Sequence, residues 1–140
     1  MGNPALFPLI YHCGSRDIVV VHINPMERSD VPQSARDIMN RINEISFNSS
    51  LMREMRAVAF VTKLLDDNKL KDNDVKRMFV HAIAADDVMQ TLTVASKFNA
   101  DWEFLMHLHG IGRERTGAWI EGNYESLNAE STIDIREAYL

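Results

Sequence analysis

The sequence predicts a helix-rich α/β fold with about two parallel strands and about four to five helices. The first observation is an almost continuously apolar, β-branched run at 17–24, which is typical of a strand covered on both faces. The second observation is a shorter run of the same kind at 78–83. The third is a long helical pattern between them, which makes the region a strand–helix–strand unit.

The composition indicates a single globular unit over residues 1–140. The apolar fraction is 46% and the charged fraction 25%, which excludes bulk disorder. The net charge is −5 and the basic residues are scattered, so we expect no nucleic-acid partner. No apolar run reaches the roughly 18 residues of a transmembrane segment. A lone Cys13 and the absence of a secretory signal pattern predict a cytoplasmic location.

The N-terminal third predicts a short helix and then a strand. Asn3 and Pro4 form a helix start, and the helix should end at Cys13 and Gly14. The strand follows at 17–24, where we expect Val20 and Ile23 to be buried on both faces, so that Val20→Asp should prevent folding. A loop over 25–32 separates this strand from the next helix.

The middle of the chain predicts a long helical stretch that Ser34 caps. Its apolar stripe comprises Ile38, Ile42, Ile45, Leu51, Met55, Val58 and Leu65. The run 47–50 favours a break or bend, because Asn and Ser prefer caps to helix interiors. Phe60 and Leu64 lie on the opposite side from Met55, so the second half should be buried on two sides.

The C-terminal half predicts a second strand at 78–83 and two further helices. Asp86 and Asp87 begin one helix, which carries Val88, Leu92 and Ala95. Asn99 or Asp101 starts the last long helix, which should be sandwiched between two partners. One apolar side of it comprises Trp102, Leu105, His109 and Ile120, and the other comprises Phe104, Leu108 and Ile111. The tail 131–140 fits no single element.

Five histidines could suggest a metal site, but their positions argue against one. His107 and His109 are two residues apart, so on a helix they point about 200° apart and cannot chelate one ion. His22 and His81 lie inside predicted strands, where a buried, hydrogen-bonded imidazole is the commoner arrangement. The sequence has neither a Cys pair nor a His-Glu-x-x-His motif. We therefore predict no metal-binding residue.

No residue forms a convincing nucleophile with its base. His12 and Cys13 are adjacent, so their side chains diverge, and Cys13 fits a small buried residue at a helix end. Ser15 does not lie in a Gly-x-Ser-x-Gly elbow and fits a turn residue. Asp86 and Asp87 fit a simpler role at a helix start, because negative charge there interacts favourably with the helix dipole. We predict no catalytic residue.

No glycine-rich phosphate loop is present either. Gly110 and Gly112 enclose a single residue, lack the third glycine of the dinucleotide motif and lie within a predicted helix. Together with Gly117 they lower the stability of that helix by up to about 1 kcal/mol each, unless they permit close packing. We therefore predict no cofactor.

Four strings give the chain a resemblance to the C-terminal portion of bacterial patatin-like phospholipases. The order of the predicted elements agrees with that region, and the resemblance covers essentially the whole chain. The strings are GNPALFPLI at 2–10, DIVVVHINP at 17–25, RINEISFNSSL at 41–51 and KFNADWEFL at 97–105. The third string is the most specific of them.

The resemblance implies an αβα sandwich of which this chain is the helix-rich C-terminal part. It also implies hydrolysis of lipid acyl esters by a Ser–Asp dyad, with the serine in a Gly-x-Ser-x-Gly elbow and the aspartate in Asp-Gly-Gly or Asp-Gly-Ala. Neither motif occurs here, nor do the oxyanion-hole glycines, and Met1 falls just after the expected aspartate. Asn3 and Pro4 match the helix start that follows the aspartate, and 19–23 matches a core strand.

We therefore expect no hydrolysis by this chain alone, because the major catalytic groups of the family are absent. A lipid or acyl ester would be a substrate only within a complete patatin domain. Two other hypotheses stay open. One is a non-catalytic helical interaction module, and the other is a small hydrolase that acts through Ser15 or Cys13.

We further expect a homo-oligomer. Two strands cannot cover two apolar faces, and a lone parallel pair leaves open edges that recruit other backbones. Phe60 and Leu64 on one helix and Phe104, Leu108 and Ile111 on another are the expected contacts. The alternative is a compact helical monomer with little sheet.

Overall fold

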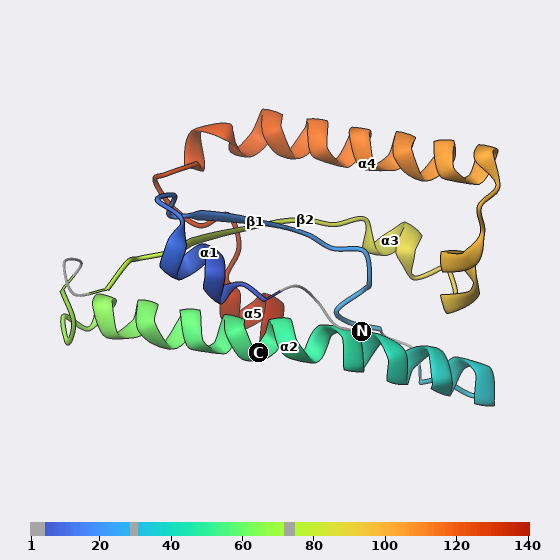
Figure 1. Cartoon of the computed structure of the whole chain (residues 1–140), viewed down its shortest axis with the longest axis horizontal. Coiled ribbons are helices and arrows are strands. Elements are labelled where there is room, and N and C mark those ends of the chain that lie inside the picture. Colours follow the sequence, from blue (N-terminus) through green and yellow to red (C-terminus); the bar gives the residue numbers. More distant parts are fainter. Residues whose placement is uncertain (1–4, 29–30, 72–74) are drawn as a thin grey trace.

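The computed structural model describes residues 5–28, 31–71 and 75–140 and confirms a helix-rich α/β fold (Figure 1). The expected helix start at Asn3 and Pro4 lies outside these residues. The elements in order are α1 (Phe7–His12), β1 (Asp17–Val21), α2 (Ala35–Asp66), β2 (Phe79–Ile83), α3 (Asp86–Met89), the 3-10 helix η1 (Val94–Phe98), α4 (Trp102–Asn123), the 3-10 helix η2 (Tyr124–Ser126) and α5 (Ile135–Tyr139). The sheet lies between α2 and α4, and α1 and α5 lie on the α2 side (Figure 1).

The sheet is a parallel pair in which Asp17 is opposite Phe79 and Val21 is opposite Ile83. Its first and last hydrogen bonds show which backbone groups face the partner strand. The N–H of Phe79 donates to the carbonyl of Arg16 at 2.8 Å, and the N–H of His22 donates to that of Ile83 at 2.9 Å. In a parallel ladder alternate residues bond to the same neighbour. Ile18 and Val20 therefore face β2, whereas the backbone groups of Val19 and Val21 point to the outer edge.

The two edges of this pair differ. On the β2 side, the N–H of Val80 donates to Ser131 Oγ at 3.0 Å and its carbonyl accepts from the N–H of Thr132 at 3.2 Å. The segment that leads into α5 therefore covers that edge. On the β1 side no strand pairs with Val19 or Val21 within the described residues. Their side chains are 43% and 65% exposed.

His81 connects the sheet to the chain around it and is fully buried. Its Nε2 lies 3.1 Å from Asp17 Oδ1 on β1, and its Nδ1 lies 3.1 Å from Thr132 Oγ1. The same Asp17 oxygen accepts from the N–H of Asn128 at 2.7 Å. The imidazole also meets the ring of Trp119 on α4 edge to face, with centroids 5.6 Å apart. His81 is thus the buried, hydrogen-bonded imidazole that the sequence predicted.

The core lies between the sheet and α2, with α1 and α5 at its sides. Its buried members are Leu6, Ile18, Leu51, Met55, Val58, Ala59, Met78, Val80, Ile135 and Tyr139. Ile18 and Val20 face this core, whereas Val19 and Val21 face the α4 side and stay exposed. The prediction that β1 is covered on both faces is wrong, because α4 lies over β2 rather than β1. Ile23 lies beyond the strand and is 60% exposed.

α2 begins as predicted, with Ser34 Oγ accepting the N–H of Asp37 at 3.1 Å. The predicted break at 47–50 is wrong, since α2 runs through it. Buried Asn48 donates its amide to the carbonyl of Pro25 at 3.1 Å, so this polar side chain serves a tertiary contact and leaves the helix intact. The stripe is buried from Leu51 onward, but its first members, Ile38, Ile42 and Ile45, are exposed.

The second half of α2 is not buried on two sides. Phe60 is 61% exposed and Leu64 is half-buried.

At the other end of the core, α1 receives its cap from α2 rather than from its own sequence. The N–H groups of Leu6 and Phe7 donate to Glu54 Oε2 at 2.5 and 2.9 Å. This carboxylate satisfies two of the orphan donors at the start of the helix.

The remaining elements depart from the predicted lengths. Asp86 and Asp87 begin α3, but α3 is a single turn, and η1 follows it. Asp101 rather than Asn99 caps α4, accepting the N–H of Phe104 at 3.0 Å. α4 is not sandwiched in the described chain, because Trp102, Leu105 and Ile120 are exposed. The unassigned tail forms α5, which packs on α2.

Met55 tests this arrangement of the core. It is fully buried against the sheet, so Met55→Ala should lower the free energy of unfolding by about 2–5 kcal/mol. Phe60→Ala, five residues along the same helix, removes an exposed side chain and should change stability by less than about 1 kcal/mol. Urea unfolding of both variants measures the difference. Equal losses would show that the core does not lie on the Met55 side of α2.

Candidate functional site

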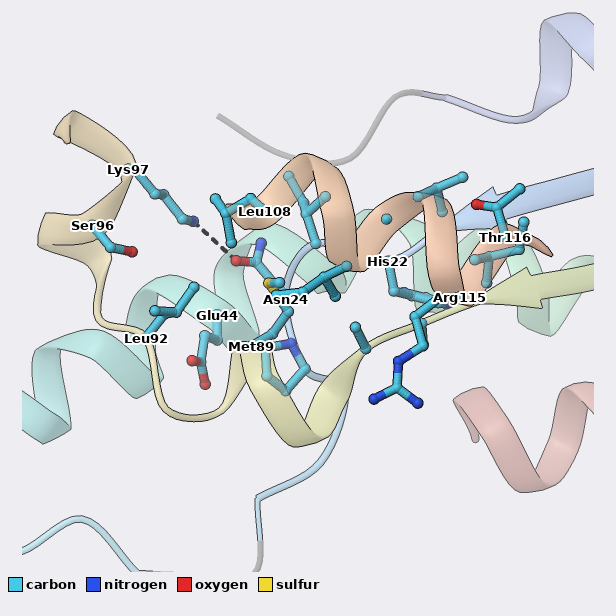
Figure 2. Close-up of a pocket in the computed structure, with 18 of the residues that line it drawn as sticks. His22, Asn24, Glu44, Met89, Leu92, Ser96, Lys97, Leu108, Arg115 and Thr116 are labelled. Atoms are coloured by element: carbon cyan, nitrogen blue, oxygen red, sulfur yellow. Dashed lines mark hydrogen bonds between the residues drawn. The ribbon is translucent and has the colours of Figure 1, made fainter. Parts of the chain in front are cut away.

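A pocket of about 330 Å³ lies where the two strands end, between the sheet and α4 (Figure 2). Parallel strands commonly place ligands beyond their carboxyl ends. The walls come from 21–25 after β1, Glu44 of α2, 83–85 after β2, Met89 of α3, the inner side of α4, and Leu92, Thr93, Ser96 and Lys97. Phe104, Leu108 and Ile111 all line it, so this side of α4 faces the sheet rather than an outer partner.

The pocket wall holds a buried amide that lacks an acceptor. Asn24 is 5% exposed, and its Oδ1 accepts a hydrogen bond of 2.9 Å from Lys97 Nζ (Figure 2). An ammonium group can only donate, so the atom that Lys97 contacts must be the oxygen. The other amide atom, Nδ2, is buried without a partner. Such an orphan donor costs about 1–3 kcal/mol and is uncommon in proteins.

Lys97 brings a positive charge to the same wall. Its Nζ also lies 5.5 Å from the ring centroid of Phe47 on α2, which is a cation–π distance. No carboxylate in the described part of the chain pairs with this ammonium. The other two charged residues of the wall, Glu44 and Arg115, both have partners of opposite charge.

Glu44 is buried, and its charge is balanced by two arginines. Arg28 holds it in a bidentate arrangement, with the shortest contact 2.6 Å, and Arg41 lies 3.3 Å away. Burial alone would raise the pKa of the Glu44 carboxyl, but the bonds from both arginines outweigh burial and lower it. Arg115 pairs with Asp87 at 2.5 Å. Lys97 is therefore the uncompensated charge among the residues that line this pocket.

His22 also lines the pocket and forms a buried polar group with α5. Its Nε2 lies 2.7 Å from the hydroxyl of Tyr139. Burial lowers the pKa of His22, although nearby Asp86 opposes that change. Burial raises the pKa of Asp86, whose Oδ1 has no partner, and raises the pKa of Tyr139 to about 12. At neutral pH His22 is uncharged and Tyr139 keeps its proton.

The predicted nucleophile candidates do not form a site. Ser15 Oγ accepts the N–H of Asp17 at 3.0 Å, as a turn residue does. Cys13 caps the end of α1 and is exposed, so the expectation that it is buried is wrong. Its carbonyl accepts from Lys76 Nζ at 2.6 Å. His12 is exposed at the end of α1 and contacts neither Ser15 nor Cys13.

The other candidates remain apart as well. His107 and His109 are exposed on α4. Among the residues that the structure describes, no three His, Cys, Asp or Glu side chains gather in a way that could hold a metal ion. Gly110 and Gly112 lie inside α4, and a Cβ at either would meet nothing within 4 Å. These glycines therefore do not serve close packing in the described chain.

Sequence reasoning missed the two residues that give the pocket its polarity. Asn24 carried a usable signal, since it is a polar side chain three residues beyond the carboxyl end of an apolar parallel strand. Lys97 carried none, because its approach to Asn24 depends on how the chain turns after α3. The predicted helix carries Leu92 and Ala95, whereas α3 ends at Met89 and the 3-10 helix η1 follows, and this change of path sets the position of Lys97.

In comparisons with known proteins, no family model, no curated protein and no solved structure matches the chain. None of the helices in the described part of the chain combines the length and apolar character that a membrane crossing needs. A functional proposal for this chain therefore rests on the geometry of the pocket and of the sheet edges, together with the resemblance in sequence.

His22 gives a pH dependence with a defined sign. Its pKa in the folded chain lies below the unfolded value of 6.5, so the unfolded chain binds the proton first as pH falls. The free energy of unfolding of the wild type should therefore decrease below about pH 6.5. That of His22→Gln, which retains a partner for Tyr139, should decrease less over the same range. Urea unfolding at several pH values measures this, with exposed His107→Gln as control. The same pH slope in wild type and His22→Gln would refute the assignment.

Proposed function

We propose that this chain is the C-terminal portion of a patatin-like lipid acyl hydrolase, where it supplies scaffold and not the catalytic dyad. Acyl esters would then be substrates of the complete domain only. The proposal rests on the sequence resemblance, and the arrangement of the chain in space supports it.

The supporting observation is that three of the four strings that carry the resemblance meet beside the pocket. Asn24 and Pro25 come from the string at 17–25, Phe47 and Asn48 from that at 41–51, and Lys97 from that at 97–105. Asn48 bonds to the carbonyl of Pro25, and Lys97 bonds to Asn24 while its ammonium lies over Phe47. Strings that are far apart in sequence thus serve one local structure.

The sheet also fits part of a larger αβα sandwich. β1 has an outer edge with no paired strand among the described residues, and its α4-side face is exposed at Val19 and Val21. Further strands can join there, whereas the segment at Ser131 and Thr132 covers the other edge. An exposed, apolar edge strand is unfavourable in a finished fold.

A second candidate function is a non-catalytic interaction module. The outer side of α4 favours it, because Trp102, Leu105 and Ile120 are 71%, 43% and 46% exposed. Exposed aromatic and aliphatic side chains of this kind are typical of contact surfaces. This hypothesis and the hydrolase hypothesis share one expectation, which is that the chain works in contact with other polypeptide.

We also propose that the purified chain self-associates through β1. Two copies can place their β1 strands antiparallel across a two-fold axis and so join two pairs into one sheet. Of the contacts expected from sequence, Phe60 is exposed and available. Phe104, Leu108 and Ile111 are not, because they line the pocket.

The chain alone should not hydrolyse fluorogenic acyl esters or phospholipid above the buffer rate. In the described part of the chain no histidine forms a hydrogen bond with Ser15 or Cys13, and the family's elbow and aspartate motifs are absent from the sequence. Turnover that survives repurification and disappears in Ser15→Ala or Cys13→Ala would instead favour a small independent hydrolase.

The coding sequence upstream of Met1 tests the family itself. In-frame Gly-x-Ser-x-Gly and Asp-Gly-Gly motifs support the proposal, and a reading frame without them contradicts it.

Val19→Pro tests the proposed association. Proline removes an N–H that points outward, so it should block strand addition while leaving the bonds between β1 and β2 in place. Light scattering during size exclusion should give twice 16.0 kDa for the wild type and for Val19→Thr, but 16.0 kDa for Val19→Pro. A wild type at 16.0 kDa at every dilution would refute association, and a folded Val19→Pro that keeps the double mass would place it elsewhere.

A further inference from the structure

The pocket at the strand ends combines an apolar body with one polar corner. Leu108 and Ile111 of α4, Leu92, and Ile83 at the end of β2 contribute apolar walls. The polar corner holds Lys97 and Asn24 (Figure 2). At about 330 Å³ the pocket lies at the lower end of the range for small-molecule sites.

The corner offers two hydrogen-bond donors, and the carboxylate that lines the same pocket is already paired. The Lys97 ammonium contacts Asn24 Oδ1 and has further donor capacity, and Asn24 Nδ2 has no acceptor among the residues that the structure describes. Because Oδ1 and Nδ2 belong to one amide, the two donors are neighbours. The nearby Glu44 carboxylate already binds Arg28 and Arg41. The corner therefore selects an acceptor with negative charge.

We propose that this pocket binds a small amphipathic monocarboxylate. The carboxylate accepts from Lys97 Nζ and Asn24 Nδ2, and its apolar body lies against the inner side of α4. A carboxylate has two oxygens, which can accept from both donors at once and satisfy the buried amide. The inference concerns binding alone and does not depend on the proposed family, so the absence of hydrolysis leaves it untouched.

Two probes with different bodies test the class of ligand. Octanoate has a flexible linear body and phenylbutyrate an aromatic one, so their relative affinities show which shape the pocket prefers. Octanol has a linear body of the same length without the charge. Calorimetric titration of the full chain should show saturable binding of one carboxylate per chain, with octanol at least about tenfold weaker than octanoate.

Two pairs of variants locate the site. Lys97→Met should weaken carboxylate binding about tenfold and leave octanol unchanged, whereas Lys63→Met, which alters an exposed lysine of α2, should change neither. Gly112→Leu places a side chain into open space at the pocket wall and should abolish binding. Gly110→Leu makes the same change on α4 outside the pocket and should bind as the wild type does.

The variants remain informative if one of them fails to fold. Leucine is a better helix former than glycine, so Gly112→Leu and Gly110→Leu should both melt at or above the wild-type temperature. Octanol binding as tightly as octanoate would overturn the carboxylate assignment. Wild-type affinity in folded Gly112→Leu, or no saturable binding of either carboxylate, would overturn the site.

Discussion

A parallel pair of strands has two edges and two faces to protect, and this chain protects only half of them. The pair depends on His81, which is fully buried and bonds to Asp17 on β1 and Thr132 beyond β2. Through these bonds the C-terminal segment lies along β2 and covers its outer edge. α2 and α5 cover one face of both strands. α4 lies over the other face at β2, whereas that face of β1 and the outer edge of β1 stay open within the described residues.

This one-sided protection explains the pocket. Since α4 lies over β2 and extends past the strand ends, it encloses space between its inner side and the loops that follow the strands (Figure 1). η1 then places Lys97 within hydrogen-bond distance of Asn24. The polar corner therefore combines residues from two distant parts of the sequence, and it includes a buried donor that has no partner among the described residues. A bound acceptor would satisfy that donor, whereas packing alone cannot.

The sequence predicted what is encoded locally. Both strands, the Ser34 cap of α2 and the Asp101 cap of α4 depend on neighbouring residues, and all appear in the structure. Asn48 shows the limit of such reasoning, because a side chain that normally interrupts a helix instead bonds to Pro25. Burial of β1 on both faces was predicted from its apolar run, but a strand covered on one face can have the same composition as one covered on both. Lys97 had no local signal, since its role arises only from the path of η1.

β1 is closed toward β2 and open on its outer side within the described residues. Amide hydrogen exchange at two protein concentrations tests it most directly. The amides of Val20 and His22, which donate to β2, should be protected at both concentrations. Those of Val19 and Val21 should exchange fast in dilute protein and slow down only as copies associate. Equal protection of all four amides at every dilution would contradict an open β1 edge.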